Sequence, residues 1–173
     1  MINKTLAKQI NEMYKVDQDL RGQAKRGRGP INFLIYAIDW VHNYRIKKII
    51  ELYGYPNLKL IGKGGLHNFW LLIQHQDFDI ELQKACLKRC CFSKKDEAFL
   101  TDRILIKREG RQLYGTQFRR VGQKLELFPI KDKKMINSRR KKVGLNPLEK
   151  YSQKINNKLE KGLKRKNSQN NKF

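Results

Sequence analysis

Polar residues that can do chemistry follow a very apolar run. Residues Phe69 to Ile73 read Phe-Trp-Leu-Leu-Ile, and Gln74-His75-Gln76-Asp77 come directly after them. Because a helix C-terminus favours a protonated imidazole, His75 is a candidate general acid or base, with Asp77 close by in the chain. The alternative is a hydrogen-bonded histidine with a purely structural role.

A second polar pair, Asp102-Arg103, interrupts the apolar segments Phe99-Leu100 and Ile104-Leu105. One interpretation is a partly buried ion pair with neighbouring helices. In the other, the planar guanidinium of Arg103 holds a phosphate group.

A third candidate region is Tyr114-Gly115-Thr116-Gln117, which we place on the first strand of a hairpin. Tyr114 and Gln117 are candidates for positioning a substrate. A glycine weakens a strand interior unless a bulge or a close neighbour requires it. Gly115 therefore suggests that something approaches the backbone here.

The cysteines and the other histidines do not form a metal-site pattern. Cys86 and Cys90 stand four residues apart on one predicted helix, but no second Cys/His pair follows at finger-like spacing, and His42 and His67 belong to other segments. We therefore predict no metal and no cofactor. Three thiols, with Cys90 and Cys91 adjacent, are not a disulfide framework and indicate a reducing compartment.

No apolar stretch reaches the roughly 20 residues of a membrane span, and the N-terminus lacks the apolar run of a secretory signal. We expect a cytoplasmic protein.

The elements that position these groups are mostly helical. Apolar residues recur at helical spacing, and the alternation that follows predicts a β-hairpin within residues 111–129, with strands at 112–118 and 124–128. In the second helix we expect Phe33, Tyr36 and Trp40 on the apolar-facing side. The predicted helices cover residues 3–20, 31–53, 66–74, 80–91, 98–107 and 137–143.

The fold class that follows is mainly α (α+β), a small helical domain with one C-terminal hairpin. We expect a single globular domain over residues 1–151. Residues 152–173 form a basic tail with too few apolar residues to offset its ordering entropy, so we expect a disordered or frayed-helix segment.

The charge of the chain indicates its class of partner. The 173 residues hold 39 Lys+Arg against 16 Asp+Glu, a formal net charge of +23, whereas about 2–8 suffices to keep a small domain soluble. Residues 131–173 alone hold 15 basic and 3 acidic residues. We expect these basic segments to contact nucleic acid, through Lys25, Arg26, Arg28, Arg139, Arg140, Lys141, Lys142, Lys164, Arg165 and Lys166.

The polar residues, in their order along the chain, resemble those of an uncharacterised bacterial family, the domain of unknown function number 6624. The resemblance covers about residues 5–151 and depends most on the Gln-His, Asp-Arg and Tyr-Gly-Thr-Gln strings. It also includes Asp17 with Arg21, and the later arginine pair followed by Gly144-Leu145. Where the family tends to have an aspartate before the arginine pair, this chain has Asn137.

The resemblance implies a shared polar pocket without an established activity. Its residues here would be Gln74, His75, Asp77, Asp102, Arg103, Gln112, Tyr114, Thr116 and Gln117.

Three hypotheses follow. The first is a basic protein associated with nucleic acid, RNA in preference to DNA. The second is a metal-independent phosphodiesterase or RNase-like enzyme or toxin, in which His75 moves the proton and Arg103 stabilises the phosphorane. The third is a structural subunit of a ribonucleoprotein particle such as a ribosome.

Overall fold

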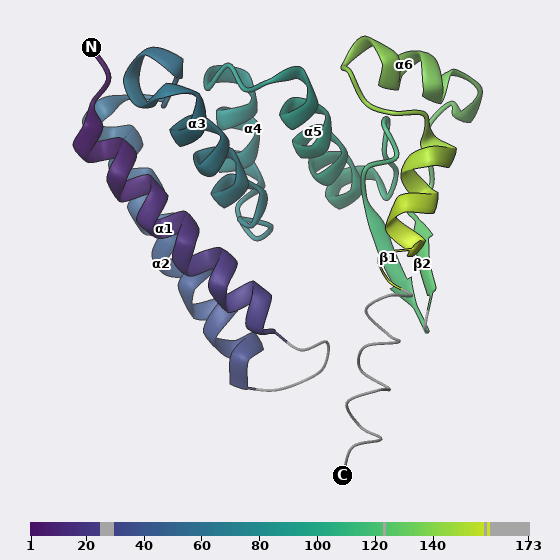
Figure 1. Cartoon of the computed structure of the whole chain (residues 1–173), viewed down its shortest axis with the longest axis horizontal. Coiled ribbons are helices and arrows are strands. Elements are labelled where there is room, and N and C mark those ends of the chain that lie inside the picture. The colour runs from purple at the N-terminus through teal and green to yellow at the C-terminus, as the bar shows by residue number, and fades with distance from the viewer. Residues whose placement is uncertain (25–29, 123, 158, 160–173) are drawn as a thin grey trace. The chain divides into compact units, whose positions relative to one another are not determined.

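The computed structural model describes residues 1–24, 30–122, 124–157 and 159. The fold is mainly helical with one small antiparallel hairpin in the C-terminal part, which confirms the predicted fold class (Figure 1). The elements are α1 (Lys4–Gln23), α2 (Pro30–Tyr53), α3 (Leu58–Gln74), α4 (Ile80–Arg89), α5 (Lys94–Glu109), β1 (Phe118–Val121), β2 (Lys124–Leu127), the 3₁₀ turn η1 (Lys133–Met135) and α6 (Ile136–Lys142). Residues 148–157 are also helical.

The chain forms two compact units, Met1–Asp96 and a second that begins at Glu97. The boundary falls in the first turn of α5, inside the residues 1–151 that the sequence predicted to be one domain. Among the described residues, no helix is both long and apolar enough to cross a bilayer.

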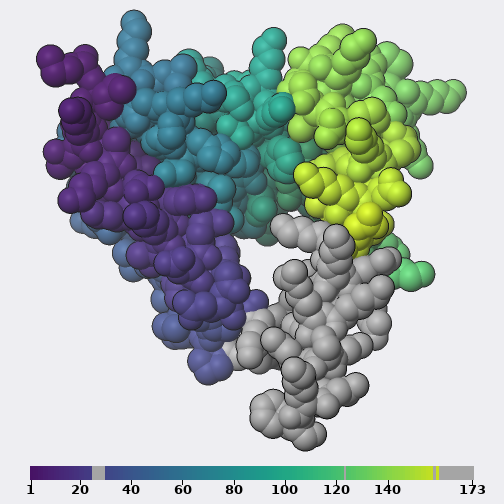
Figure 2. All heavy atoms as spheres, in the orientation of Figure 1, coloured from purple at the N-terminus to yellow at the C-terminus, as the bar shows by residue number. Residues whose placement is uncertain are grey.

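In the first unit, α1 packs against α3 and α2, and Figure 2 shows atoms of α1 and α3 in contact on the face in view. Leu6 and Ile10 of α1 and Phe69 and Leu72 of α3 are buried, because apolar residues at helical spacing share one side of each helix. Asn3 caps α1 by accepting from the Leu6 N–H at 2.9 Å.

Helix α3 begins at Leu58, eight residues before the start that the sequence predicted. Asn57 is its N-cap and accepts from the N–H groups of Lys59 and Leu60. The first helical turn of α3 ends at a kink, where Gly62 has φ +70°. Residues other than glycine adopt this backbone conformation only at a cost in free energy.

Helix α2 also differs from expectation. Its buried residues are His42, Asn43, Ile46 and Ile49, whereas the aromatic residues of its N-terminal half lie in solvent. A helix can bury only the side that meets its neighbours, and the aromatic side of α2 is not covered by the other described helices.

In the second unit, the hairpin pairs Phe118 with Leu127 and Val121 with Lys124. Its first strand starts at Phe118 rather than at residue 112. Residues 112–117 form a loop instead, because the backbone N–H groups that a strand would use for pairing bond to a buried side chain of α5.

Candidate functional site

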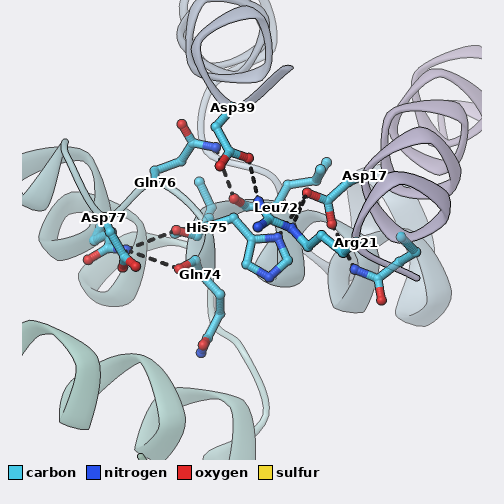
Figure 3. Close-up of polar contacts among 11 residues, drawn as sticks. Asp17, Arg21, Asp39, Leu72, Gln74, His75, Gln76 and Asp77 are labelled. Atoms are coloured by element: carbon cyan, nitrogen blue, oxygen red, sulfur yellow. Dashed lines mark hydrogen bonds and ion pairs between the residues drawn. The ribbon is translucent and has the colours of Figure 1, made fainter. Parts of the chain in front are cut away.

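Four side chains from three segments of the first unit meet in one polar cluster. Asp17 and Arg21 lie one turn apart on α1, Asp39 lies on α2, and His75 follows α3 (Figure 3). Arg21 Nε donates to Asp17 Oδ1 at 2.8 Å, and its Nη2 contacts Asp39 Oδ1. His75 Nδ1 lies 3.0 Å from the same oxygen of Asp17. We call these four residues the Asp17 cluster.

Local structure places each member of the Asp17 cluster. Asp17 continues the buried side of α1 one turn after Met13, so a carboxylate enters the apolar core. His75 is the C-cap of α3, and its backbone N–H bonds to the Leu72 carbonyl at 3.2 Å. This bond fixes the point at which the imidazole leaves the helix.

The electrostatics of the two carboxylates differ. Burial raises the pKa of Asp17, but the hydrogen bonds and positive charges of His75 and Arg21 outweigh burial and hold its pKa below the ordinary value. For Asp39, burial outweighs the influence of Arg21, and the pKa is raised. Asp17 is therefore the more firmly ionised of the two.

The imidazole of His75 is held from one side only. An ionised Asp17 accepts from Nδ1–H, which leaves Nε2 as the second ring nitrogen. No hydrogen bond joins Nε2 to the described residues, and the side chain is 16% exposed. In Figure 3 the ring extends from the turn after α3 toward Asp17. An oriented imidazole with an open second nitrogen can act as a general acid or base.

A further histidine, which the sequence patterns did not single out as catalytic, lies near this cluster. His42 is only 2% exposed, and its Nδ1 has no partner among the described residues. Burial lowers the pKa of His42, the charge of Asp17 opposes this effect and the charge of Arg45 adds to it, and the resulting pKa is about 4. The available signal was its position three residues after Asp39 on the same helix, which places both on the inward side.

The cluster also contains the ligand types of a metal site. One ligand atom each from Asp17, Asp39 and His75 lie within 4.8 Å of one another. Arg21, however, already bonds to both carboxylates, so a metal ion would have to displace its guanidinium. The arrangement is best described as two carboxylates bridged by an arginine.

Asp77 and the glutamines near it have contacts of their own. Gln83 Nε2 lies 3.4 Å from Asp77 Oδ1 and donates to the Ile73 carbonyl at 3.1 Å. Gln76 is fully buried and donates to the Leu72 carbonyl. These bonds tie the turn after α3 to α4, which supports a structural role for Asp77.

In the second unit, Asp102 is fully buried and surrounded by donors. Its Oδ1 accepts from the N–H groups of Leu113 at 2.7 Å and Tyr114 at 2.9 Å. Its Oδ2 accepts from the N–H and the hydroxyl of Thr116, both at 2.9 Å. Burial raises the pKa of Asp102, and these four donors offset part of that effect. We call this arrangement the Asp102 cradle.

The same loop is held from its other side by Arg140, which is 1% exposed. Its guanidinium donates to the carbonyls of Tyr114, Gly115 and Asn146 and lies 4.9 Å above the ring of Tyr151. A Cβ on Gly115, where φ is +65°, would lie 2.8 Å from Leu148. The close neighbour that the glycine indicated is therefore Leu148.

The two glutamines of this region bond to each other. Gln112 donates to the carbonyls of Gln117 and Phe128, and the Gln117 N–H donates to Gln112 Oε1 at 2.9 Å. Asn137, where the family tends to have aspartate, accepts from the Leu148 N–H at 2.8 Å and so caps the helical residues 148–157.

The predicted catalytic residues thus divide between the units. His75 and Asp77 belong to the first, and Asp102, Arg103, Tyr114 and Gln117 belong to the second. Within the second unit the structure brings Asp102, Tyr114, Thr116 and the glutamines together, while Arg103 is a half-buried residue of α5. Within the first it joins His75 to Asp17 and Arg21, which were not among the predicted catalytic residues.

The predicted nucleic-acid contacts also differ in placement. Arg139 bonds to the carbonyls of Leu113, Lys131 and Asp132, and Arg140 is buried, so both stabilise the fold. Lys141 and Lys142 are exposed. Lys25, Arg26, Arg28, Lys164, Arg165 and Lys166 lie outside the described residues.

The first unit also has a cavity of about 400 Å³, lined mainly by apolar atoms and by Lys63, His67, Cys91 and Lys95. His67 Nδ1 lies 3.5 Å from Asp96, but among the described residues no hydrogen bond joins it to Cys91.

Comparison with known proteins gives a family and no activity. No curated protein and no solved structure matches this sequence. The model of a family described as "Family of unknown function (DUF6624)" matches residues 5–166, which is nearly the whole chain. The chain therefore belongs to this family.

Proposed function

We propose that this protein associates with nucleic acid, with RNA as its preferred partner, either free or in a ribonucleoprotein particle. The observation that carries the proposal is the net charge of +23. Even if every acidic side chain paired with one basic side chain, 23 basic groups would have no acidic partner in the chain. A polyphosphate supplies that missing negative charge.

The ion pairs of the described residues support this interpretation. Glu51 and Glu81 are engaged by Lys48 and Lys84 on their own helices, and Asp79 is engaged by Lys47. Several acids are thus neutralised within the protein and do not repel a phosphate backbone. The exposed Lys141 and Lys142 are cations that α6 presents to solvent.

The test is the salt dependence of binding. We expect the full chain to bind a fluorescein-labelled single-stranded RNA of 16 nucleotides, with affinity falling steeply as salt rises from 50 to 200 mM. The variant Lys141→Gln/Lys142→Gln should lower the slope of log K against log salt by about 0.7 for each phosphate that the variant no longer neutralises. Lys84→Gln is the matched control, because Lys84 is already paired with Glu81.

Equal binding by Lys141→Gln/Lys142→Gln and the parent would remove α6 from the contact surface. Absence of any binding at 50 mM salt would overturn the proposal itself. Competition with a DNA strand of the same sequence decides the preference between RNA and DNA, and cosedimentation with ribosomes at moderate salt would identify a particle subunit.

A second candidate function has its own supporting observation, the 3.0 Å contact of His75 Nδ1 with the buried Asp17. In this proposal the protein is a metal-independent phosphodiesterase of RNA. His75 Nε2 accepts the proton of the attacking 2′-hydroxyl, the resulting imidazolium is stabilised by Asp17, and the proton then passes to the leaving 5′-oxygen. Arg21 bonds to Asp17 and Asp39 and so orients the carboxylate that holds His75.

The test is cleavage of an end-labelled RNA by freshly purified protein. We expect His75→Gln to abolish cleavage and Asp17→Asn to reduce it about a hundredfold or more, since general acid–base catalysis contributes about 10²–10⁴-fold. His67→Gln is the control histidine, which is exposed and lies on α3 about two turns before His75. Cleavage by His75→Gln at the parent rate would exclude this function without affecting RNA binding.

A further inference from the structure

Helix α2 carries a row of exposed aromatic rings. Phe33, Tyr36, Trp40 and Tyr44 are 76%, 69%, 60% and 65% exposed. Their spacing of three or four residues places them on one side of the helix, over a length of about 16 Å. We call these four residues the aromatic stripe.

The opposite side of α2 explains why this side is open. His42, Ile46 and Ile49 face the core of the first unit, where α1 packs against α2 (Figure 1). The helix is therefore anchored by its inward side, and the stripe is presented outward on a fixed scaffold. Trp40 is held further by stacking on Phe78, with ring centroids 4.3 Å apart.

Exposed aromatic side chains in such a number need a reason. Single apolar residues on a surface are ordinary, but a contiguous row marks an interaction site. Each exposed ring can stack on a base, and such stacking tolerates any sequence because every base has a flat face. Rings one helical turn apart can engage successive bases of one strand.

The charge beside the stripe favours a nucleic acid over other occupants. Arg45 is exposed beside Tyr44, and no acidic side chain among the described residues pairs with it. Lys47 and Lys48 on the next turn are each paired with an acid, so Arg45 is the cation that this side of α2 offers to a phosphate. A second copy of this chain would bring another +23 charge to the same surface and be repelled. A helix that lies in a membrane surface keeps its charged side in water, but the opposite side of α2 is buried in protein.

We propose that the aromatic stripe of α2 is a stacking platform for single-stranded nucleic acid, with Arg45 beside it holding a phosphate. This inference rests on the proposed nucleic-acid association and names the surface that performs it. It predicts a preference for single strands over duplexes, whose bases already stack on each other.

The first experiment uses the fluorescence of the full-length protein. The chain has two tryptophans, the exposed Trp40 and the 8% exposed Trp70. Addition of a 12-nucleotide uridine oligomer should quench the emission of Trp40. In Trp40→Phe only Trp70 emits, so the same addition should leave its emission unchanged. Unchanged emission of the parent under conditions where it binds the oligomer would overturn the proposal.

The second experiment compares affinities of ring-retaining and ring-removing variants. Tyr44→Leu and Tyr36→Leu should each weaken binding of the oligomer about five- to a hundredfold, the range that loss of one stacked base implies. Tyr44→Phe keeps the ring and should bind like the parent. Tyr53→Leu is the matched control, an exposed tyrosine of α2 outside the stripe. Circular dichroism and melting temperatures check that each variant folds.

The outcomes separate this inference from the function on which it rests. If the parent binds no RNA at 50 mM salt, the proposed function fails. If the parent binds but Tyr36→Leu and Tyr44→Leu bind equally well, or duplex RNA binds as tightly as single strands, the stripe proposal alone fails. The stripe proposal also fails if the stripe variants keep RNA binding and instead lose binding to vesicles of phosphatidylcholine and phosphatidylserine. It fails likewise if they keep RNA binding and instead lose the ability to form a dimer, measured by light scattering.

Discussion

The two units each bury one aspartate, and the partners of these two carboxylates differ in kind. Asp17 is 1% exposed and meets the side chains of Arg21 and His75. Asp102 is fully buried and meets three backbone N–H groups and a hydroxyl. Both are satisfied, as buried charges must be.

This difference separates a structural carboxylate from one able to take part in chemistry. Backbone donors cannot titrate or move, so the Asp102 cradle fixes the conformation of the loop at residues 112–117. Side-chain donors can rotate away from the carboxylate they hold, so the contacts of the Asp17 cluster can change when a ligand arrives. Two buried aspartates of the same chain therefore have surroundings of different kinds.

The largest effect on stability is expected when Asp102 is replaced. Asp102→Asn should lower the free energy of unfolding of the second unit by about 3–4 kcal/mol, because an amide N–H₂ would face donors and leave buried N–H groups unpaired. Urea denaturation followed by circular dichroism measures it. Thr116→Val removes only the hydroxyl donor and should lower it by about 1 kcal/mol. A change below about 1 kcal/mol for Asp102→Asn would refute the cradle.

The second prediction concerns the pH dependence of the stability of the first unit, which holds His42. Because the pKa of His42 falls from about 6.5 in the unfolded chain to about 4 when buried, the unfolded state binds one more proton between these values. Stability from His42 is therefore present above pH 6.5 and lost as pH falls toward 4, by about 3 kcal/mol.

Urea denaturation between pH 4 and 7 tests this dependence. His42→Leu should flatten the curve, whereas His67→Gln should keep it, since His67 is an exposed histidine of the same unit. An unchanged slope in His42→Leu would show that other groups carry the pH response.

The smallest effect concerns the other carboxylate. Asp17→Asn should cost about 1–2 kcal/mol at pH 7, less than a fully buried pair, because Arg21 is partly exposed and keeps Asp39. The pKa of Asp17 is lowered by folding, so its contribution is present above its ordinary pKa and lost as pH falls through the folded value. The loss in Asp17→Asn should therefore shrink in acid, measured at pH 7 and pH 3.

Sequence patterns predicted the class of fold and most helices, because apolar spacing reports which side of a helix is covered. They did not place the first strand, since alternation at residues 112–117 is compatible with a strand until Asp102 takes its N–H groups. They also predicted burial for Phe33 and Trp40, which are exposed. An apolar pattern cannot tell whether a covering surface belongs to the same chain.

The candidate site was predictable only in part. The position of His75 after an apolar run indicated a polar group at the edge of the core. Its partner Asp17 lies 58 residues earlier, and no local pattern joins the two. Arg103 was the predicted phosphate ligand because it adjoins Asp102 in sequence, but contact in the fold joins His75 to the cluster of Arg21.

The loop at residues 112–117 is held by one side chain that precedes it in the sequence and by another that follows it. The order in which a ribosome makes these residues therefore decides when the loop can be fixed. The carboxylate of Asp102, which accepts from the Thr116 N–H, lies 14 residues before Thr116. The guanidinium of Arg140, which donates to the Tyr114 carbonyl, lies 26 residues after Tyr114. On a ribosome, the unit that ends at Asp96 has all its helices before the later of these two contacts is made. The first unit can thus fold before Arg140 of the second unit has been synthesised. A nascent chain that stalls before Arg140 exposes the loop at residues 112–117 to proteases.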